Sequence, residues 1–246
     1  MFSDVRRTKW SSLRRLLCLP AACLALLAGE EPAAPESWRA VLATMPLRTN
    51  VTELNWTNCA KLILAAYQSN EVVRALILMP GATDELYFFH RVKVTLTNAT
   101  PTLLDVVVAL TNQSYIRVAY RPPMLLLHSR EDLLDASFKI NHEPTSRFLR
   151  QTPYLPVVRY NDRDWDYLLP HLTGTLEVNF LPSLDSPDSY HFYRHSFAAC
   201  HLTGWETLVA ISLAGRSVFT VDEDRVRFEV DYRPREAPIP PSGPVR

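Results

Sequence analysis

Glycine is scarce in this chain, which has six glycines among 246 residues and nineteen prolines. Loops that cradle phosphate groups need backbone amides that no Cβ atom crowds, which glycine provides. The small number of glycines therefore disfavours a nucleotide-binding loop. The sequence also lacks a Gly-x-Ser-x-Gly motif, which disfavours a serine hydrolase built on a nucleophile elbow. With 47% apolar and 21% charged residues, the chain still has the composition of a globular protein. Its length suits one large domain or two small ones.

An excess of positive charge is also missing. The 26 basic and 26 acidic residues balance, and five of the basic ones but only one acidic residue lie in the first fifteen positions. The remaining 21 basic and 25 acidic residues therefore give the rest of the chain a net charge of −4. A nucleic-acid-binding surface depends on neutralising phosphates, so this balance argues against a nucleic-acid partner.

The uncharged apolar run at residues 16–28 is thirteen residues long, shorter than the roughly 20 that a membrane-spanning helix needs. It follows Arg14 and Arg15 and precedes Gly29 and two glutamates, a layout typical of a secretory signal peptide. We therefore expect residues 1–28 to be a signal peptide, and the chain to be exported to the periplasm or the extracellular space with no stable membrane span after cleavage. The cleavage position stays open, and an uncleaved amphipathic N-terminus is the alternative.

Beyond residue 28, hydropathy patterning predicts an α+β fold made of two tandem βαββαβ-like units, each a small sheet with two helices. A polar stretch between two apolar, periodic regions marks the boundary. The predicted segments are a flexible spacer at 29–46 with a first short element at 38–44, an α+β module at 47–128, a linker at 129–156 with a short strand at 137–140, a second α+β module at 157–232 and a disordered Pro-rich tail at 233–246.

The two predicted modules share an order of elements and little residue identity. In each, an apolar, aromatic strand is followed by a short break, a helix and two short strands. These segments are 85–97, 102–113, 116–120 and 124–128 in the first module, and 190–202, 205–214, 217–221 and 225–231 in the second. Ahead of them, one apolar stripe predicts a helix from residue 57, and the nearly all-apolar stretch 72–79 predicts a buried strand.

Two cysteines, Cys59 and Cys200, remain after the predicted leader. In an oxidising compartment they could form a disulfide. Cys59 lies on the apolar stripe of a predicted helix, where a free thiol packs well. We favour two buried thiols, because a bridge between separate cores needs Cα atoms within about 7 Å, but the sequence leaves both outcomes open.

Metal-ligating residues occur in two clusters. The densest histidine cluster comprises His191, His195 and His201. Four residues of strand span about 13 Å, so two of these imidazoles cannot converge on one ion without a bend. The second cluster resembles the start of a calcium loop but lacks its glycine and its bidentate glutamate; it comprises Asp162, Asp164 and Asp166. We expect no metal site and no cofactor.

Four asparagines begin Asn-x-Ser/Thr sequons, all in the first module: Asn50, Asn55, Asn98 and Asn112. In a eukaryotic secretory protein they would be glycan acceptors. In a bacterium they would be turn and cap residues. The sequence does not decide between the two origins.

One segment order resembles the short modules at the front of secretins and TonB-dependent receptors. It consists of an apolar strand, the predicted helix 102–113 and the predicted strands 116–120 and 124–128. After Thr102 the helix begins Leu-Leu-Asp-Val-Val-Val-Ala-Leu. The resemblance covers residues 55–128 and, more weakly, 161–231. Ser114 stands where that family usually has a glycine. The resemblance implies an exported bacterial protein.

Three functions follow as hypotheses. The first is a non-catalytic protein-interaction module of the bacterial cell envelope, to which a protein partner adds a strand. Its predicted contact residues are aromatic: Tyr87, Phe89, Tyr190, Phe192 and Tyr193. Plain core packing is the alternative for these rings.

The second hypothesis is an RNA-recognition-like nucleic-acid binder, which the charge balance and the predicted export oppose. The third is a metal-assisted hydrolase. Its residues would be Asp185, Asp188, His191 and His195. We predict no catalytic residue and favour the first hypothesis; the partner and the oligomeric state stay open.

Overall fold

The computed structural model describes residues 37–68, 70–79, 92–114, 116–128, 134–163, 168, 178–182 and 195–230. These residues belong to one compact unit, Ala33–Arg246. The described helices are α1 (Ser37–Ala43), α2 (Trp56–Ala66), α4 (Leu103–Gln113), α5 (Glu143–Gln151) and α7 (Gly204–Gly215). The described strands are β1 (Ala75–Leu78), β2 (Arg117–Arg121), β3 (Met124–His128), β4 (Phe138–Ile140), β5 (Pro153–Arg163), β6 (Asn179–Pro182), β7 (His195–Thr203), β8 (Ser217–Val221) and β9 (Arg225–Val230). The predicted α+β class is confirmed.

The strands form two sheets. The five-stranded sheet has the order β2-β3-β1-β7-β5, with β1 and β3 parallel and the other pairs antiparallel. The four-stranded sheet has the order β4-β8-β9-β6, in which β8 and β9 form an antiparallel pair and each edge strand runs parallel to its neighbour.

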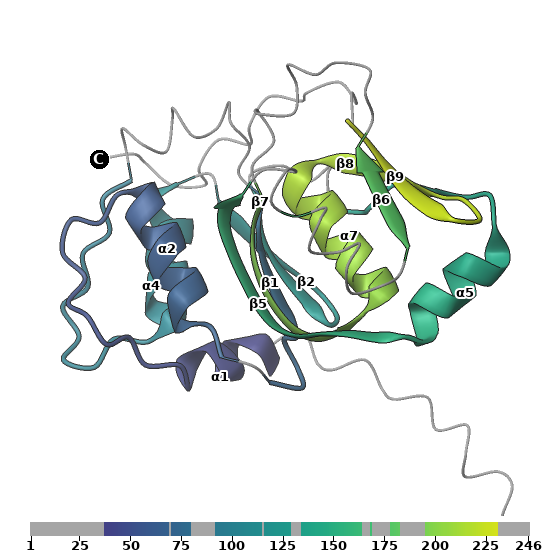
Figure 1. Cartoon of the computed structure of the whole chain (residues 1–246). Helices are drawn as coiled ribbons and strands as arrows, with labels where there is room; N and C mark the ends of the chain where they lie inside the picture. Colours follow the sequence, from purple (N-terminus) through teal and green to yellow (C-terminus); the bar gives the residue numbers. More distant parts are fainter. Residues whose placement is uncertain are drawn as a thin grey trace, which may run out of the picture. The chain divides into compact units, whose positions relative to one another are not determined.

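Each face of the five-stranded sheet belongs to a different core. Leu76, Leu78 and Ala198 point into a core that also contains residues of α1, α2 and α4. Ala75, Ile77 and other alternate residues point into a second core, which includes α7 and the inner face of the four-stranded sheet. Helix α7 therefore lies between the two sheets (Figure 1).

The amino-acid sequence of α7 explains this position, because ten of its twelve residues are buried. A helix that is apolar on every side needs cover on every side, which two sheets provide. Its N-terminus is fixed by a capping box: Glu206 N donates to Thr203 Oγ1, and Thr203 N donates to the Glu206 carboxylate. Helix α4 begins in the same way, with Thr102 and Asp105.

The predicted division into two modules with separate sheets is wrong for these residues. Strand β7, from the second predicted module, pairs with β1 of the first along Ala75–Leu78. The reason is that every residue of β1 is buried, so β1 needs a neighbour on each side and cover on both faces. One small module with its own sheet does not provide this, whereas β3, β7 and the helices on both faces do.

Two connecting segments are also more ordered than predicted. The spacer 29–46 contains α1, whose Trp38 and Leu42 are buried, as the short element expected at 38–44 anticipated. The linker 129–156 contains the predicted short strand as β4, but also helix α5, anchored by the fully buried Leu149. The signal peptide at 1–28 and the tail at 233–246 lie outside the described residues.

Candidate functional site

The predicted contact residues cannot be placed. Tyr87, Phe89, Tyr190, Phe192 and Tyr193 lie outside the described residues, and so do Asp185, Asp188 and His191 of the hydrolase hypothesis. The contact residues and the hydrolase residues therefore remain predictions.

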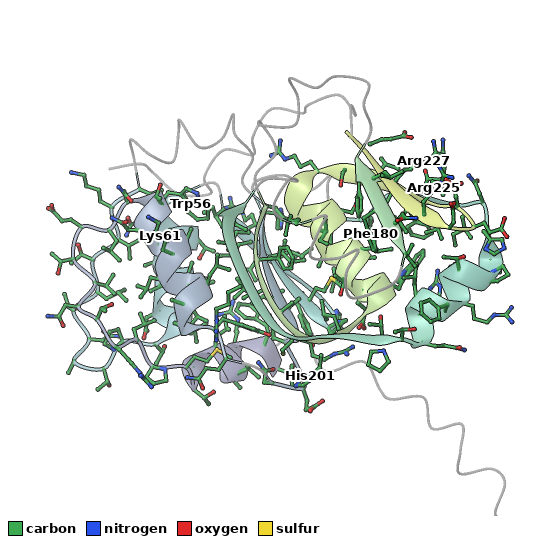
Figure 2. All side chains as sticks on the ribbon, in the orientation of Figure 1. Trp56, Lys61, Phe180, His201, Arg225 and Arg227 are labelled. Carbon is green, nitrogen blue, oxygen red and sulfur yellow. The ribbon has the colours of Figure 1, made fainter. Side chains whose placement is uncertain are left out.

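His201 is the one member of the histidine cluster whose side chain is described. It lies exposed near the end of β7, and its backbone has a φ of 50°, a left-handed conformation that is uncommon outside glycine (Figure 2). Its carbonyl accepts a hydrogen bond of 2.8 Å from Arg74 Nη1. Within the described ranges, no group of three or more His, Cys, Asp or Glu side chains is arranged to hold a metal ion.

Most of the exposed apolar side chains belong to the two edge strands of the four-stranded sheet and to α5. Among the described residues, five large hydrophobic side chains are exposed, and four of them belong to β4, α5 or β6. These four are Phe138, Ile140, Phe148 and Leu181. Phe138 and Ile140 come from the three-residue edge strand β4, which makes this strand the strongest candidate for a binding site.

Strand β4 is open on one side. It pairs with β8 through Phe138↔Phe219 and Ile140↔Val221, and it is the last strand in the order of its sheet, so no described strand pairs with its outer edge. All three of its residues are exposed. An edge strand of this kind presents unpaired backbone N–H and C=O groups to a partner.

A row of aromatic rings crosses the inner face of the four-stranded sheet and ends at β4. The ring centroids of Phe138 and Phe219 are 5.6 Å apart, those of Phe219 and Phe228 are 6.1 Å apart, and those of Phe228 and Phe180 are 6.5 Å apart. Phe219 is fully buried, whereas Phe138 is 45% exposed. The row therefore begins in the core and reaches solvent at the edge of the sheet.

Trp205 of α7 covers the β4 end of this row. Its ring centroid lies 4.9 Å from that of Phe138 and 5.3 Å from that of Phe219, both edge to face. The Arg150 guanidinium of α5 lies 3.8 Å from the Trp205 ring centroid, within the range of a cation–π contact. The inner side of Phe138 is thus held by packed rings while its outer side faces water.

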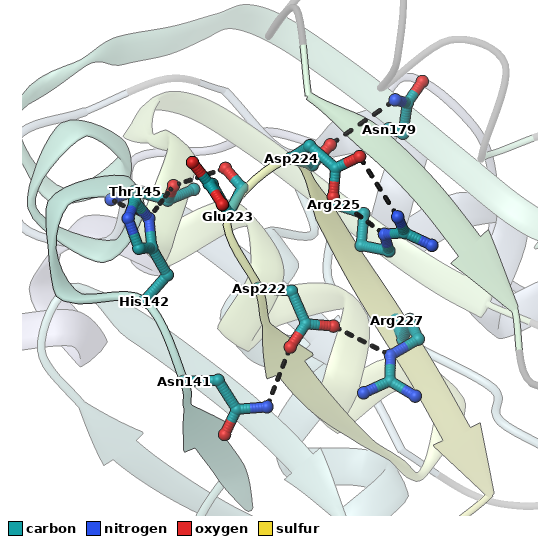
Figure 3. Close-up of polar contacts among 9 residues, drawn as sticks. All are labelled: Asn141, His142, Thr145, Asn179, Asp222, Glu223, Asp224, Arg225 and Arg227. Carbon is teal, nitrogen blue, oxygen red and sulfur yellow. Dashed lines mark hydrogen bonds and ion pairs between the residues drawn. The ribbon is translucent and has the colours of Figure 1, made fainter.

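Polar contacts to the β8–β9 turn fix β4 and α5 (Figure 3). Asn141, directly after β4, donates from Nδ2 to Asp222 Oδ1 at 2.8 Å, and Asp222 also accepts from Arg227 Nε at 2.9 Å. The hydrogen bond from Asn141, and then the contact with Arg227, lower the pKa of Asp222. The Thr145 hydroxyl of α5 donates to the Glu223 carbonyl at 2.8 Å.

The same turn holds the opposite edge strand. Asn179 of β6 contacts the Asp224 carbonyl through Nδ2 at 3.4 Å, and Asp224 forms an ion pair with Arg225 (Figure 3). The turn is therefore a common anchor for both edges of the four-stranded sheet.

Both cysteines are free and buried, as favoured above. Burial raises the pKa of the Cys59 thiol to about 12. The Cys200 sulfur lies 3.6 Å from the hydroxyl of the buried Tyr67, and that hydroxyl donates to the Val73 carbonyl at 2.6 Å. A protonated thiol is a poor nucleophile, so the raised pKa makes Cys59 unreactive at neutral pH.

Sequence reasoning found the strand at β4 but missed its importance. Residues 137–140 were predicted as a strand within a linker, so Phe138 and Ile140 received no role. The alternation Phe-Lys-Ile, apolar on one face and basic on the other, was the available sign of an exposed edge strand.

Among the described helices, none combines the length and the apolarity needed to cross a bilayer. Comparison of the chain with family models, with curated proteins and with solved structures finds no match. The candidate site is therefore defined by its geometry alone.

Proposed function

We propose that this chain is a non-catalytic docking protein of the bacterial cell envelope, and that a protein partner binds it by adding a strand to β4. One observation carries the proposal: β4 is an edge strand whose Phe138 and Ile140 remain exposed at the end of a packed aromatic row. A strand beside β4 would hydrogen-bond to its open edge and cover both side chains.

The alternation of β4 defines the partner's chemistry. Phe138 and Ile140 share the inner face with Phe219, and Lys139 lies on the outer face opposite Thr220. The partner strand would place apolar side chains beside Phe138 and Ile140, where they continue the row of cross-strand contacts. An acidic side chain opposite Lys139 would set the register, because charged edge residues otherwise oppose strand pairing.

Export is the second part of the proposal. It is supported by Arg14 and Arg15 before the uncharged run at 16–28 and by the glutamates that follow. Fractionation of the native host with an antibody against the folded unit tests it. Recovery from the envelope or the medium in a form shortened at its N-terminus is expected. Recovery from the cytoplasm at full length would contradict export.

Site-specific photo-crosslinking in the native host tests docking. A photoreactive residue at Lys139 should give one discrete adduct with a protein partner. The same residue at the exposed Lys61 of α2, on the other side of the five-stranded sheet, should give none. The adduct at position 139 should disappear when Ile140→Asp places a charge on the docking face.

The Ile140→Asp chain must keep its far-UV circular dichroism spectrum for this comparison. Because Ile140 is 36% exposed, we expect it to fold. Equal adducts at positions 61 and 139, or an adduct at 139 that survives the aspartate, would refute docking at β4.

A further inference from the structure

A pocket lies away from β4, beside the C-terminal end of α2. The pocket has a volume of about 370 Å³ and is open to solvent. Its walls come from the chain after α1, from the last turn of α2 and from one side chain of β5. No residue of β4, α5 or the β8–β9 turn contributes to it, so it is independent of the proposed docking surface.

The polar lining of this pocket is cationic. Arg48 and Arg159 both line it, with Thr49 and Gln68 as further polar groups, and none of the described lining residues carries a carboxylate. Two guanidinium groups that line one pocket repel each other, and an anion between them relieves that repulsion. Arginine forks are also well suited to bind carboxylate or phosphate oxygens through two hydrogen bonds.

The two arginines differ in how they are held. Arg159 donates from Nη2 to the Tyr67 carbonyl at 2.9 Å, where α2 ends. A cation at a helix C-terminus stabilises the helix, so this contact has a structural role. It uses one of five guanidinium donors and leaves the others available. Arg48 is exposed and forms no hydrogen bond or ion pair with any residue the structure describes.

The remaining wall is apolar. Leu62 and Ala66 of α2 line the pocket together with the arginines. The volume lies at the lower end of the range for small-molecule sites, about 300–1,000 Å³. We propose that this pocket binds a small organic oxyanion, a carboxylate or a phosphate monoester, whose charged group lies between Arg48 and Arg159 and whose apolar part packs on Leu62 and Ala66.

Calorimetric titration of the full chain with three probes tests this site. Phenyl phosphate and phenylacetate carry the two anionic groups on similar apolar bodies, and benzyl alcohol is their neutral counterpart. We expect at least one anion to bind with a Kd below about 1 mM and benzyl alcohol to bind at least about ten-fold more weakly. The tighter anion identifies the natural class of ligand.

Two variants that each remove one positive charge test whether the anion binds in this pocket. Arg48→Ser should weaken the tighter anion by about ten- to a hundred-fold, because it removes charge-assisted hydrogen bonds and no contact of the described fold. Lys61→Ser removes one exposed cation from α2 (Figure 2). Lys61 is not among the residues that line the pocket. This substitution should change the Kd by less than about two-fold, as expected for a screened charge.

Three outcomes would overturn the proposal. They are the absence of binding by both anions up to about 10 mM, the same affinity for benzyl alcohol as for the anions, and equal losses in the two variants, which would show non-specific attraction of charge. Docking at β4 is measured by a different assay on different residues, so either proposal can fail alone.

Discussion

Replacement of Phe219 by alanine tests the aromatic row that supports β4. Phe219 is fully buried, and its ring packs against those of Phe138, Trp205 and Phe228. Truncating a buried phenylalanine costs about 3–5 kcal/mol, a range that already includes its ring contacts, each worth about 0.5–1.5 kcal/mol beyond the area that it buries. Because Phe219 makes three such contacts, we expect Phe219→Ala to lower the free energy of unfolding by an amount in the upper half of this range, about 4–5 kcal/mol.

The matched control is Phe138→Ala in the same row. Because Phe138 is 45% exposed, its truncation loses about half as much buried surface, and we expect a loss of about 2 kcal/mol. Urea unfolding followed by far-UV circular dichroism measures both variants. If Phe219→Ala does not fold, Phe219→Leu should still lose about 1–2 kcal/mol. A loss for Phe219→Ala no larger than that for Phe138→Ala would refute the packing described here.

Three further predictions concern other contacts. The capping hydrogen bond from the Thr102 backbone N–H lowers the pKa of Asp105. The stability that Asp105 adds is therefore present above its unfolded-state pKa and is lost as the pH falls through the lower folded-state pKa. Asp105→Asn should cost about 1 kcal/mol at neutral pH, and urea unfolding at a series of acidic pH values should show this cost shrinking as Asp105 becomes protonated. In a chain with Cys18→Ser and Cys23→Ser, Cys59 and Cys200 should react with a thiol reagent only after urea is added. Rapid labelling of this chain without urea would contradict the burial of the two thiols. Glu206 caps α7 and pairs with Arg74 at 2.6 Å, so Glu206→Ala should lower the thermal midpoint by about 3–8 °C in calorimetry, and an unchanged midpoint would show that neither contact stabilises the fold.

Local features of the fold were predictable from the sequence. The apolar stripe that includes Cys59 and Ile63 predicted α2, and the unbroken apolar run at 72–79 predicted a fully buried strand where β1 lies. Both depend on periodicity within one short segment, which the sequence displays directly. The same holds for the helix at 102–113, which α4 matches closely.

The pairing of strands was not predictable in the same way. Ala75 of β1 lies opposite Ala199 of β7, more than a hundred residues later. The sequence of neither strand indicates that the other is its pairing partner. Duplicated element order suggested two sheets, but backbone hydrogen bonds accept any strand of suitable length and burial. The candidate site shares this limit, because the exposure of Phe138 depends on β8 and α7, which pack on one side of it only.

The long separation between β1 and β7 has a consequence for how the chain acquires its structure. The sheet in the middle of the unit needs β3 on one side of β1 and β7 on the other, and α7, which covers it, follows β7. Contacts between residues so distant along the chain form slowly, because a large loop must close before any stabilisation results. A polypeptide emerging from a ribosome or a translocation channel would expose the apolar residues of β1 until β7 and α7 had also emerged. A chaperone that shields these residues during this interval would raise the yield of native protein.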